Sequence, residues 1–466
     1  MSLMVAAQPS PWKRPALLLG LLTLLFCLPL LWRALAPVQF DSDEGWNVAR
    51  AMMAAHDVPL YGQPPGLDFT NYPFLSFHLL GWLVALGFDP LFAGRGLALA
   101  SLLVVGGLAG ALARLFTAQA YAALFAAILF VLWLSIWMPN RVALDDPQLF
   151  GMVLEAAGFY VFVRGGTFAL RLSAYLFILA LFIKQSLIAL PIGAGLSLML
   201  QRRWRDLFNW LLAGALGGGL LLWLTLRRDG PFFFANLLAP RAYIWRDLGS
   251  QGGDYLLVFL PALVLAGLWC QRHWRQQRAQ PFILAWLAAN ALGFAFAGGD
   301  GVGRNVFFEA VLLNTVLAMA ECAEAPRSWR AVLLLFPLVW APAHFISVLH
   351  EDQALPRARA DFAAGVAALK AVQGPVVCEN LLLCARAGHV PAFSPYFVES
   401  QLRLGRISPA AITAMLPGLK AVEIGTTDLP DPPRDVMYPP SFLAALKQND
   451  RLILARPSLA IWVPRH

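Results

Sequence analysis

The chain has 466 residues, of which 59% are hydrophobic and only 13% charged, and its mean hydropathy is +0.64. Soluble domains carry roughly twice that charged fraction, so the composition excludes an ordinary soluble protein and indicates a polytopic helical membrane protein. The net charge of +8 comes from Lys and Arg spread over short loops, as membrane topology requires. No basic patch with interleaved aromatic residues suggests nucleic-acid binding.

The first apolar stretch, residues 15–31, is too long for a typical cleaved signal segment. We therefore expect an uncleaved first span, with the polar residues 1–14 in the cytoplasm. Ten further apolar stretches are close to, or slightly short of, the ~17–25 residues that a spanning helix needs. They lie at 91–113, 118–137, 147–163, 168–183, 186–200, 207–226, 254–271, 281–297, 304–320 and 331–349.

The loop charges predict which segments cross the membrane. Residues 73–87 are ambiguous by length, but the basic clusters fall on one side only if this segment does not cross, and cytoplasmic loops hold the excess of Lys and Arg. We therefore predict a juxtamembrane or re-entrant helix at 73–87, about eleven spans, and an outer C-terminus. The clusters are Lys13-Arg14, Arg114, Arg164 with Arg171, Arg202-Arg203-Arg205, Arg272 to Arg278 and Arg327 to Arg330.

The same topology places nearly every acidic residue of the membrane part in an outer loop or at its edge. Carboxylates distant in sequence then share one face, which is the arrangement of an active site on the outer surface. Charge near hydrocarbon is costly, so acids at a membrane boundary are functional candidates. They are Asp41, Asp43, Glu44, Asp57, Asp68, Asp145, Asp146, Asp229, Asp247, Asp254 and Asp300.

The tail, residues 351–466, has the composition of a soluble domain, in contrast to the membrane module 1–350 with its first outer loop at 38–90. Alternating patterns predict strands at 376–379, 421–424, 451–455 and 459–463, and helices at 409–420 and 442–447. We expect a small α/β domain on the periplasmic side. Cys378 and Cys384 could form a disulfide if this domain is exported, but their spacing alone does not decide it.

Asp41-Ser42-Asp43-Glu44 follows the first span. Asp-x-Asp can hold a divalent metal on a nucleotide-sugar diphosphate, but such donors are cytoplasmic, and the motif alone is a weak signal. On the outer face a carboxylate suits a general base that deprotonates an acceptor hydroxyl or amine. The structural alternative is that these acids cap a helix that starts near Glu44.

Two later segments carry further candidates. Asn140 to Pro147 contains Arg141, Asp145 and Asp146, which either cap the next helix or orient an acceptor beside the base. Gly298 to Arg304 is glycine-rich and is either a flexible turn or a phosphate-binding backbone.

Lys184, Arg241 and Arg246 lie at outer boundaries, where they either snorkel or bind phosphate. The seven His show no metal-ligand spacing, so no metal or cofactor is indicated, although a divalent metal is left open.

The acidic pair after the first span, the segment Asn71-Tyr72-Pro73-Phe74-Leu75 and the second Asp motif resemble the GT-C membrane glycosyltransferases. The resemblance is to the bacterial branch of the protein O-mannosyltransferase and lipid A aminoarabinose transferase superfamily, over about residues 1–350, and it extends to the Gly-rich segment that ends in Asn305 and Glu309. The α/β tail is similar to the periplasmic domains of several members.

The resemblance implies transfer of a sugar from a polyprenyl-phosphate carrier to a lipid, glycan or protein acceptor. It implies a multi-pass protein of the bacterial inner membrane, with Asp43 as catalytic base, Glu44 as its neighbour, and Asp146, or else Asp145, as second-loop acid. Tyr61, Tyr72, Asn305 and Glu309 are candidates for the substrate groove.

One departure from the family pattern concerns the donor phosphate. Relatives that modify lipid A commonly have Lys-Pro-Pro-Leu where this chain has Tyr72-Pro73-Phe74-Leu75, so their phosphate-binding Lys is absent here. Lys184, Arg241 or Arg304 would then supply the positive charge.

Two other classes fit the composition. A lipid-linked sugar flippase or transporter also holds charges at membrane depth, but such proteins usually show inverted repeats and charges near the middle of spans, whereas here the acids lie at span ends. A polysaccharide polymerase or ligase typically relies on Arg and His in a large outer loop. The leading Asp-Glu pair favours the transferase.

Overall fold

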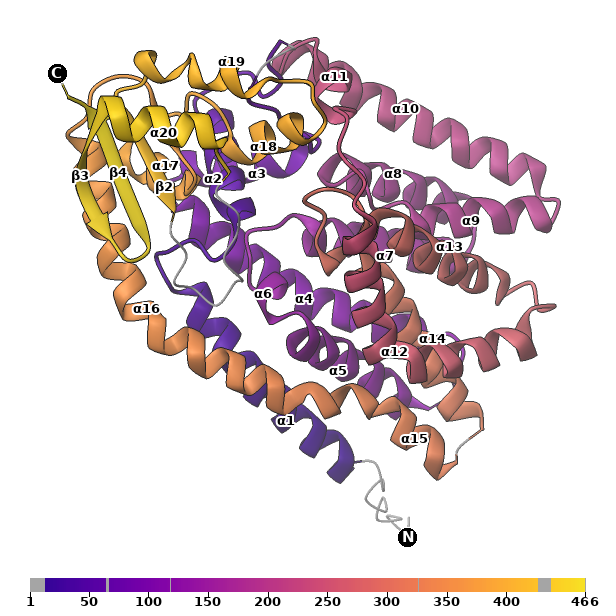
Figure 1. Cartoon of the computed structure of the whole chain (residues 1–466). Helices are drawn as coiled ribbons and strands as arrows, with labels where there is room; N and C mark the ends of the chain where they lie inside the picture. The colour runs from indigo at the N-terminus through magenta and orange to yellow at the C-terminus, as the bar shows by residue number, and fades with distance from the viewer. Residues whose placement is uncertain (1–12, 64–66, 118, 326, 426–436, 466) are drawn as a thin grey trace, which may run out of the picture.

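Helices form most of the chain in this computed structural model, which describes residues 13–63, 67–117, 119–325, 327–425 and 437–465 (Figure 1). Each of the eleven predicted apolar stretches is helical. The predicted cytoplasmic segment lies mostly outside the described residues. The corresponding helices are α1 (Lys13–Ala34), α4 (Pro90–Arg114), α5 (Ala120–Trp137), α7 (Gln148–Arg164), α8 (Thr167–Ile183), α9 (Ala189–Leu200), α10 (Trp204–Arg228), α12 (Trp245–His273), α13 (Gln280–Ala297), α14 (Phe308–Glu324) and the pair α15 (Ser328–Leu334) and α16 (Ala341–Lys370).

Seven helices among the described residues are long and apolar enough to cross a membrane, and the bent pair α15 and α16 makes an eighth. The three other predicted spans correspond to α7, α8 and α9, which have 17, 17 and 12 residues. The ambiguous segment 73–87 forms α3 (Leu75–Ala85), and its 11 residues are about 16 Å long, too short to cross a bilayer alone.

The helix bundle has an apolar core and an apolar surface. The segment Arg304–Glu324 consists of η1 (Arg304–Phe307) and α14, and in an 18-residue window of it 94% of residues are buried, so α14 lies at the centre of the bundle. By contrast α1 and α10 expose large apolar side chains, as lipid-facing helices do. They include Leu17, Leu21, Leu24, Leu28, Leu212, Leu216, Leu220 and Trp223.

Four short helices in the described part of the chain lie in the segments predicted as outer loops. They are α2 (Ser42–Ala55), α3, α6 (Pro139–Val142) and α11 (Phe233–Leu237). In Figure 1, α2 and α3 lie close to the strands and helices of the tail, and α16 runs alongside α1 toward them. This arrangement brings together the tail, the first predicted outer loop (38–90) and the second predicted outer loop (138–146).

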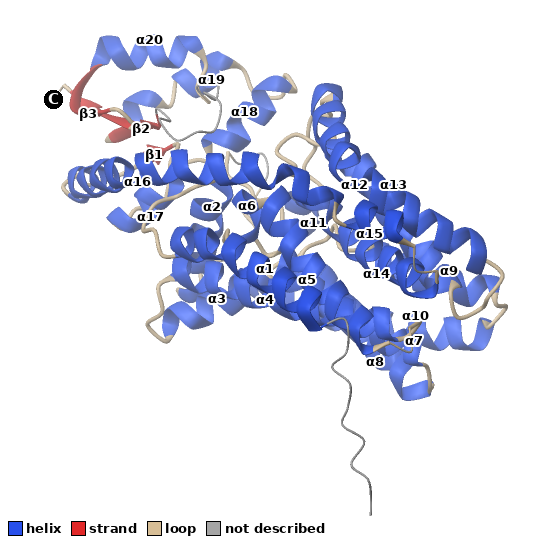
Figure 2. Cartoon of the chain, turned by 90° about the horizontal axis from the view of Figure 1, so that it is seen from below, coloured by secondary structure: helices blue, strands red, loops and turns tan. Residues whose placement is uncertain are grey.

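The tail forms the predicted small α/β domain, and its strands gather at one end of the molecule (Figure 2). The sheet has the order β1-β2-β4-β3, with β1 (Val376–Cys378) parallel to β2 (Ala421–Gly425), and β4 (Leu459–Pro464) antiparallel to both β2 and β3 (Asp450–Arg456). All four predicted strands are present. The tail helices are α17 (Leu381–Ala387), α18 (Pro395–Arg403), α19 (Pro409–Thr413), the 3-10 turn η3 (Leu416–Gly418) and α20 (Pro440–Asn449).

The predicted boundary at residues 350/351 lies inside α16, which directly follows η2 (Phe336–Trp340) and is continuous from Ala341 to Lys370. Val38 and Val48 of the first outer loop share one buried cluster with Leu383 and Ile461 of the tail. The tail is therefore packed directly onto the outer loop that carries the predicted active-site acids.

Candidate active site

The first predicted acids lie at the start of α2. Asp41 is its N-cap, and its carboxylate accepts a hydrogen bond of 3.0 Å from the backbone N–H of Asp43. The predicted capping role is thus taken by Asp41. Asp43 is in the first turn, where the helix dipole favours negative charge, and its side chain is 32% exposed. Capping therefore leaves the Asp43 carboxylate available for chemistry.

Arg141 of α6 connects the two outer loops. Its guanidinium lies 2.9 Å from Asp41 Oδ2 and 2.8 Å from Asp43 Oδ2. The partial burial of Asp43, followed by the charge of Asp41, raises the pKa of Asp43 to about 6 against the opposing effect of Arg141. Asp43 is thus a carboxylate at neutral pH but is more basic than an ordinary aspartate, as a general base requires.

Asp146 forms a second buried cluster at the start of α7. Its Oδ1 accepts a hydrogen bond of 2.7 Å from the N–H of Gln148, and Lys184 Nζ lies 2.8 and 3.0 Å from its two oxygens. Asn305 Nδ2 donates to Oδ2 at 2.9 Å. Lys184 also lies 4.9 Å from the centre of the Tyr72 ring. Three predicted residues, Asp146, Lys184 and Asn305, therefore meet in one network, in which the positive charge of Lys184 is compensated by Asp146.

Glu44 is completely buried and belongs to a different network. Arg95, also completely buried, donates to both of its carboxylate oxygens at 2.6 Å. Glu44 also accepts hydrogen bonds from the N–H groups of Phe40 and Asp145. Its oxygens are occupied by protein groups, so the geometry favours a positioning role and not contact with substrate.

Arg95 uses all five of its N–H donors. Besides Glu44, its guanidinium donates to the carbonyls of Arg33, Ala36 and Val38, at 3.2, 2.6 and 2.7 Å. These carbonyls immediately precede the Asp41 to Asp43 turn. The Glu44–Arg95 pair therefore joins the end of α1, the first outer loop and the second outer loop. Arg95 was not a sequence candidate, although a lone Arg inside the apolar stretch 91–113 is the signal that could have identified it.

A cavity opens on the Asp43 side of these networks. From the first outer loop it is lined by Asp43, Trp46 and Tyr72, and from the loop before α12 by Arg241. Ser42, Phe69 and Asn71 of the same loop also line it. The Gly-rich segment and the tail contribute Asp300, Gly301, Glu379, Leu381, Ser394, Tyr396, Phe397 and Ser400. Arg241 forms no ion pair with any carboxylate in the described part of the chain.

Tyr396 of α18 faces Asp300 and Gly301 across this cavity. Gly301 has a φ of +73°, and a Cβ there would collide with the Tyr396 hydroxyl. That hydroxyl is buried and lacks a hydrogen-bond partner among the described residues. A buried donor without a partner is costly, so the hydroxyl is available to a ligand. Neither Tyr396 nor Glu379 was a sequence candidate, because nothing in the tail pattern places it near Asp43.

Four other predicted residues lie outside the lining of this cavity. Tyr61 is buried and donates to the carbonyl of Tyr72 at 3.2 Å, and Glu309 accepts from the N–H of Ala189 at the start of α9. Arg304 pairs with Asp254, and Arg246 is exposed at the start of α12. We therefore interpret Tyr61 and Glu309 as packing and capping residues.

Asp145 is buried beneath the second loop, with its carboxylate against Gly94, where a Cβ would have no room. Burial, together with the charge of Glu44, raises the pKa of Asp145 well above its ordinary value. Asp146 is therefore the better candidate for the second-loop acid.

The Gly-rich segment packs tightly against protein groups. A Cβ at Gly298 would collide with the Tyr243 ring, and one at Gly303 would crowd Arg141. The N–H of Asp300 donates to the carbonyl of Ala242. These glycines bring the loop before α12 and the second outer loop close together, which positions Arg241 beside the cavity.

No group of three His, Cys, Asp or Glu side chains with metal-binding geometry occurs within the described ranges. The candidate carboxylates Asp41, Asp43 and Asp146 are each paired with Arg141 or Lys184 instead. That the reaction needs no metal or cofactor stays a prediction.

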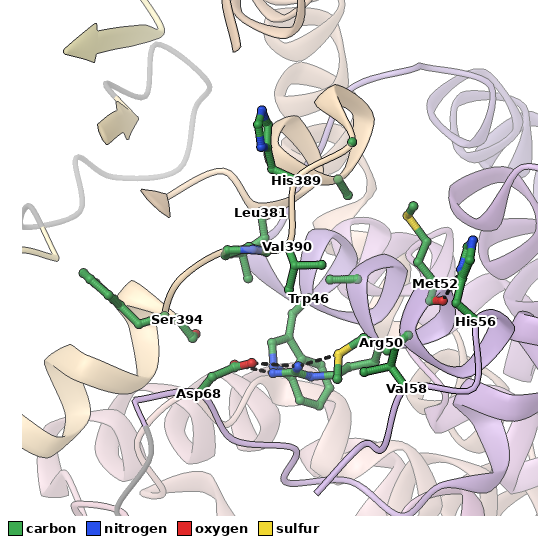
Figure 3. A pocket seen from close by; sticks show the side chains of 16 residues that line it. Trp46, Arg50, Met52, His56, Val58, Asp68, Leu381, His389, Val390 and Ser394 are labelled. Atoms are coloured by element: carbon green, nitrogen blue, oxygen red, sulfur yellow. Dashed lines mark hydrogen bonds and ion pairs between the residues drawn. The ribbon is translucent and has the colours of Figure 1, made fainter. Parts of the chain in front are cut away.

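A second cavity of about 290 Å³ adjoins the first, between α2 and the tail (Figure 3). Trp46, Leu381 and Ser394 line both cavities. In Figure 3, Arg50 and Asp68 lie beside Trp46, joined by an ion pair whose Arg50 Nη1 to Asp68 Oδ2 distance is 2.8 Å. The wall between the two cavities is thus built jointly by α2 and the tail.

The fold defines a class: a polytopic helical membrane protein with a small α/β domain packed on the segment between α1 and α4. No family model and no curated protein sequence matches the chain. Solved structures with the same fold include two of ArnT from Cupriavidus metallidurans. The one bound to undecaprenyl phosphate has a TM-score of 0.63 at 12% identity, covering 98% of each chain. The apo structure has a TM-score of 0.62 at 13% identity, covering 96% of this chain and 98% of ArnT.

The predicted GT-C fold is therefore confirmed over nearly the whole length of the chain, tail included. At this level of identity the likeness shows the fold, and the chemistry has to be argued from the residues of the site.

Proposed function

We propose that this protein is a membrane glycosyltransferase that moves a sugar from a polyprenyl-phosphate donor to a hydroxyl or amine of a lipid, glycan or protein acceptor. The observation that carries the proposal is the cavity in which Asp43, a carboxylate of raised basicity, shares one space with Arg241. A base and a cation without a partner carboxylate are the two groups that such a transfer needs. The likeness in fold to ArnT bound to undecaprenyl phosphate supports the same class of donor.

The donor phosphate would bind at Arg241 with help from the Tyr396 hydroxyl. Arg241 is the one predicted phosphate ligand that both lines the cavity and lacks an ion pair within the described ranges, since Lys184 pairs with Asp146 and Arg304 with Asp254. A guanidinium can make two parallel hydrogen bonds to phosphate oxygens. Arg241 thus replaces the Lys that the family pattern places near Tyr72.

The transfer step needs no covalent intermediate. Asp43 accepts the proton of the acceptor hydroxyl or amine as that atom attacks the anomeric carbon from the face opposite the phosphate. The bond between the anomeric carbon and the phosphate oxygen breaks, and polyprenyl phosphate leaves with the bonding electrons, stabilised by Arg241. Configuration is inverted, and the proton passes from Asp43 to solvent. Positioning and proton removal provide the rate enhancement.

The surrounding networks hold this geometry. Arg141 orients Asp43 and Asp41, while the network of Asp146, Lys184 and Asn305 fixes the second loop. The Glu44–Arg95 pair joins both loops below them. Glu44 and Asp146 are therefore proposed as positioning residues.

The proposed location is the inner membrane of a bacterium, with the N-terminus in the cytoplasm and the tail in the periplasm. Cys378 and Cys384 form a disulfide, a pairing that their spacing in the sequence did not decide. Disulfides persist in oxidising compartments, which supports the outer placement of the tail. The same placement puts Asp43 and Arg241 on the outer face.

Mass spectrometry of polyprenyl-phosphate sugars and envelope glycolipids, comparing cells with and without the gene, tests the function. We expect the deletion to accumulate one lipid-linked sugar and to lose one glycosylated product. Purified protein in lipid vesicles should then convert that lipid-linked sugar when an envelope extract from the deletion strain is added. Movement of the lipid across the vesicle without any transfer would support a flippase and overturn the proposal.

Replacing Arg241 by Ala should raise the KM for the lipid-linked donor by roughly 10- to 100-fold, because a hydrogen bond to a charged group contributes about 1.5–3 kcal/mol. Arg241→Lys keeps the charge but loses the two-pronged geometry, so its KM should be intermediate. The assay varies donor concentration with purified enzyme. Arg406→Ala, an exposed Arg of the tail, is the control. Equal donor KM values for Arg241→Ala and Arg406→Ala would contradict the phosphate assignment.

The pH profile of transfer reports the state of Asp43. A base acts only when deprotonated, and the pKa of Asp43 is about 6, so kcat/KM should fall as the pH drops below 6. In that range kcat/KM should decrease tenfold for each pH unit. Asp41→Asn removes a neighbouring negative charge but keeps the capping oxygen, so the midpoint should move to lower pH. A midpoint that does not move in Asp41→Asn would assign the titration to another group.

A further inference from the structure

The tail contributes a carboxyl group to the active-site cavity. Glu379 directly follows β1, at the carboxyl end of the parallel pair β1 and β2, and lines the same cavity as Asp43 and Arg241. It reaches the cavity because the tail packs on α2. Ligands of open α/β sheets commonly bind at this edge.

Backbone groups of the tail hold Glu379 in place. Its Oε2 accepts a hydrogen bond of 2.6 Å from the N–H of Gly425, and its Oε1 accepts one of 3.2 Å from the N–H of Met437. The next residue, Asn380, caps α17, and the disulfide between Cys378 and Cys384 closes the turn around both. The side chain is therefore fixed in the wall of the cavity.

Two hydrogen bonds leave part of the carboxyl group of Glu379 unused, since a carboxylate can accept about four. No Lys or Arg of the described residues forms an ion pair with it. A carboxylate without a cation repels phosphate, so Glu379 is unsuited to the donor phosphate, which Arg241 would bind. Its unused lone pairs suit a hydrogen-bond donor on the other substrate.

We propose that Glu379 is an acceptor-binding residue, and that the tail around it forms the subsite that recognises a hydroxyl group of the acceptor. This inference rests on the proposed transferase function. A hydroxyl both donates and accepts hydrogen bonds. Burial raises the pKa of Glu379 to about 7, so at neutral pH its carboxyl group can donate a hydrogen bond when protonated and accept one when ionised. An ammonium group on the acceptor would bind only to the ionised form.

The titratable groups around Glu379 are Glu399 and Glu423, with Tyr438 beside Glu423. Glu423 is completely buried, accepts from the N–H of Asn380 and does not line the cavity. It is the matched control, because it lies in the same sheet edge but does not reach the substrate space.

The test uses full-length protein in lipid vesicles, the lipid-linked donor that accumulates in the deletion strain, and an envelope extract of that strain as the source of acceptor. Two rates are measured for each variant: transfer to the extract at increasing dilution, and release of free sugar from the donor when the extract is omitted. The second rate reports the donor site alone.

We expect Glu379→Ala to raise the extract concentration needed for half-maximal transfer by at least tenfold, while sugar release and donor KM stay within twofold of wild type. Glu379→Gln, which still donates and accepts, should lose less than threefold, and Glu423→Gln should match wild type. A wild type that transfers nothing would overturn the proposed function itself.

If Glu379→Ala and wild type need the same extract concentration for half-maximal transfer, Glu379 does not bind the acceptor. A loss in Glu379→Gln as large as that in Glu379→Ala overturns the hydroxyl assignment. If Glu379→Ala fails to fold, Glu379→Gln and Glu379→Asp test the assignment. The shorter Asp side chain should then raise the extract concentration for half-maximal transfer at least tenfold, whereas Gln should not.

Discussion

Asp43→Asn is expected to lower the rate of sugar transfer by about 10²- to 10⁴-fold, the range that general-base catalysis contributes. Asparagine has the shape of aspartate but cannot accept the proton, and no other carboxylate in the described cavity lining is placed beside Arg141 in the same way. The variant should remain folded, because Asp41, the helix cap, is untouched. The measurement is transfer by purified enzyme at saturating donor.

Asp57→Asn is the control for that variant. Asp57 is an exposed residue at the other end of α2, with a φ of 54° that Asn also tolerates, and it pairs with Arg228 at the surface. Its transfer rate should equal that of wild type. Substantial activity in Asp43→Asn would remove Asp43 as the base and would shift attention to Asp300 and Glu379, the other acids of the cavity.

Arg95→Met should destabilise the protein by about 3–5 kcal/mol, the usual effect of removing one partner of a buried ion pair. The substitution leaves the buried carboxyl group of Glu44 without its cation, and it leaves the carbonyls of Ala36 and Val38 without donors. We expect a large fall in the yield of folded protein and in the temperature of thermal unfolding in detergent. Transfer activity should fall with it, since both catalytic loops depend on this pair.

Arg228→Met tests whether burial of the Glu44–Arg95 pair is the reason for the large destabilisation expected in Arg95→Met. The Arg228–Asp57 pair is largely exposed, and exposed pairs contribute at most about 1 kcal/mol. Its unfolding temperature should therefore lie close to that of wild type. Similar unfolding temperatures for Arg95→Met and Arg228→Met would show that the Glu44–Arg95 pair does not anchor the loops.

Some features of the tail could not be predicted from the pattern. Residues 409–420 were expected to form one helix, but α19 ends at Thr413, and Pro417, which cannot donate a backbone hydrogen bond, lies in the 3-10 turn that follows. The helices α17 and α18 were missed because each has fewer than ten residues. Packing against α2 and the disulfide stabilise α17 more than its own sequence does.

The roles of the charged candidates depended on distances that no pattern contains. Glu44 and Asp43 are neighbours in sequence, yet one is completely buried on Arg95 and the other faces the cavity. Lys184, Arg241 and Arg304 were equivalent as possible phosphate ligands. The structure separates them, since Lys184 and Arg304 have carboxylate partners and Arg241 lines the cavity with none in the described chain.

By itself the sequence determined the positions of the apolar helices, the cap at the start of α2 and the strands of the tail. These features depend on hydrophobicity and hydrogen bonding between residues close along the chain. Only the tertiary structure decided which charges pair, and that Glu379 and Tyr396 of the tail share a cavity with Asp43. A hydrogen bond forms only when donor and acceptor lie about 3 Å apart, and the Coulomb energy of an ion pair weakens as its charges separate. These roles therefore follow from proximity in space, which a sequence separation of more than 300 residues does not reveal.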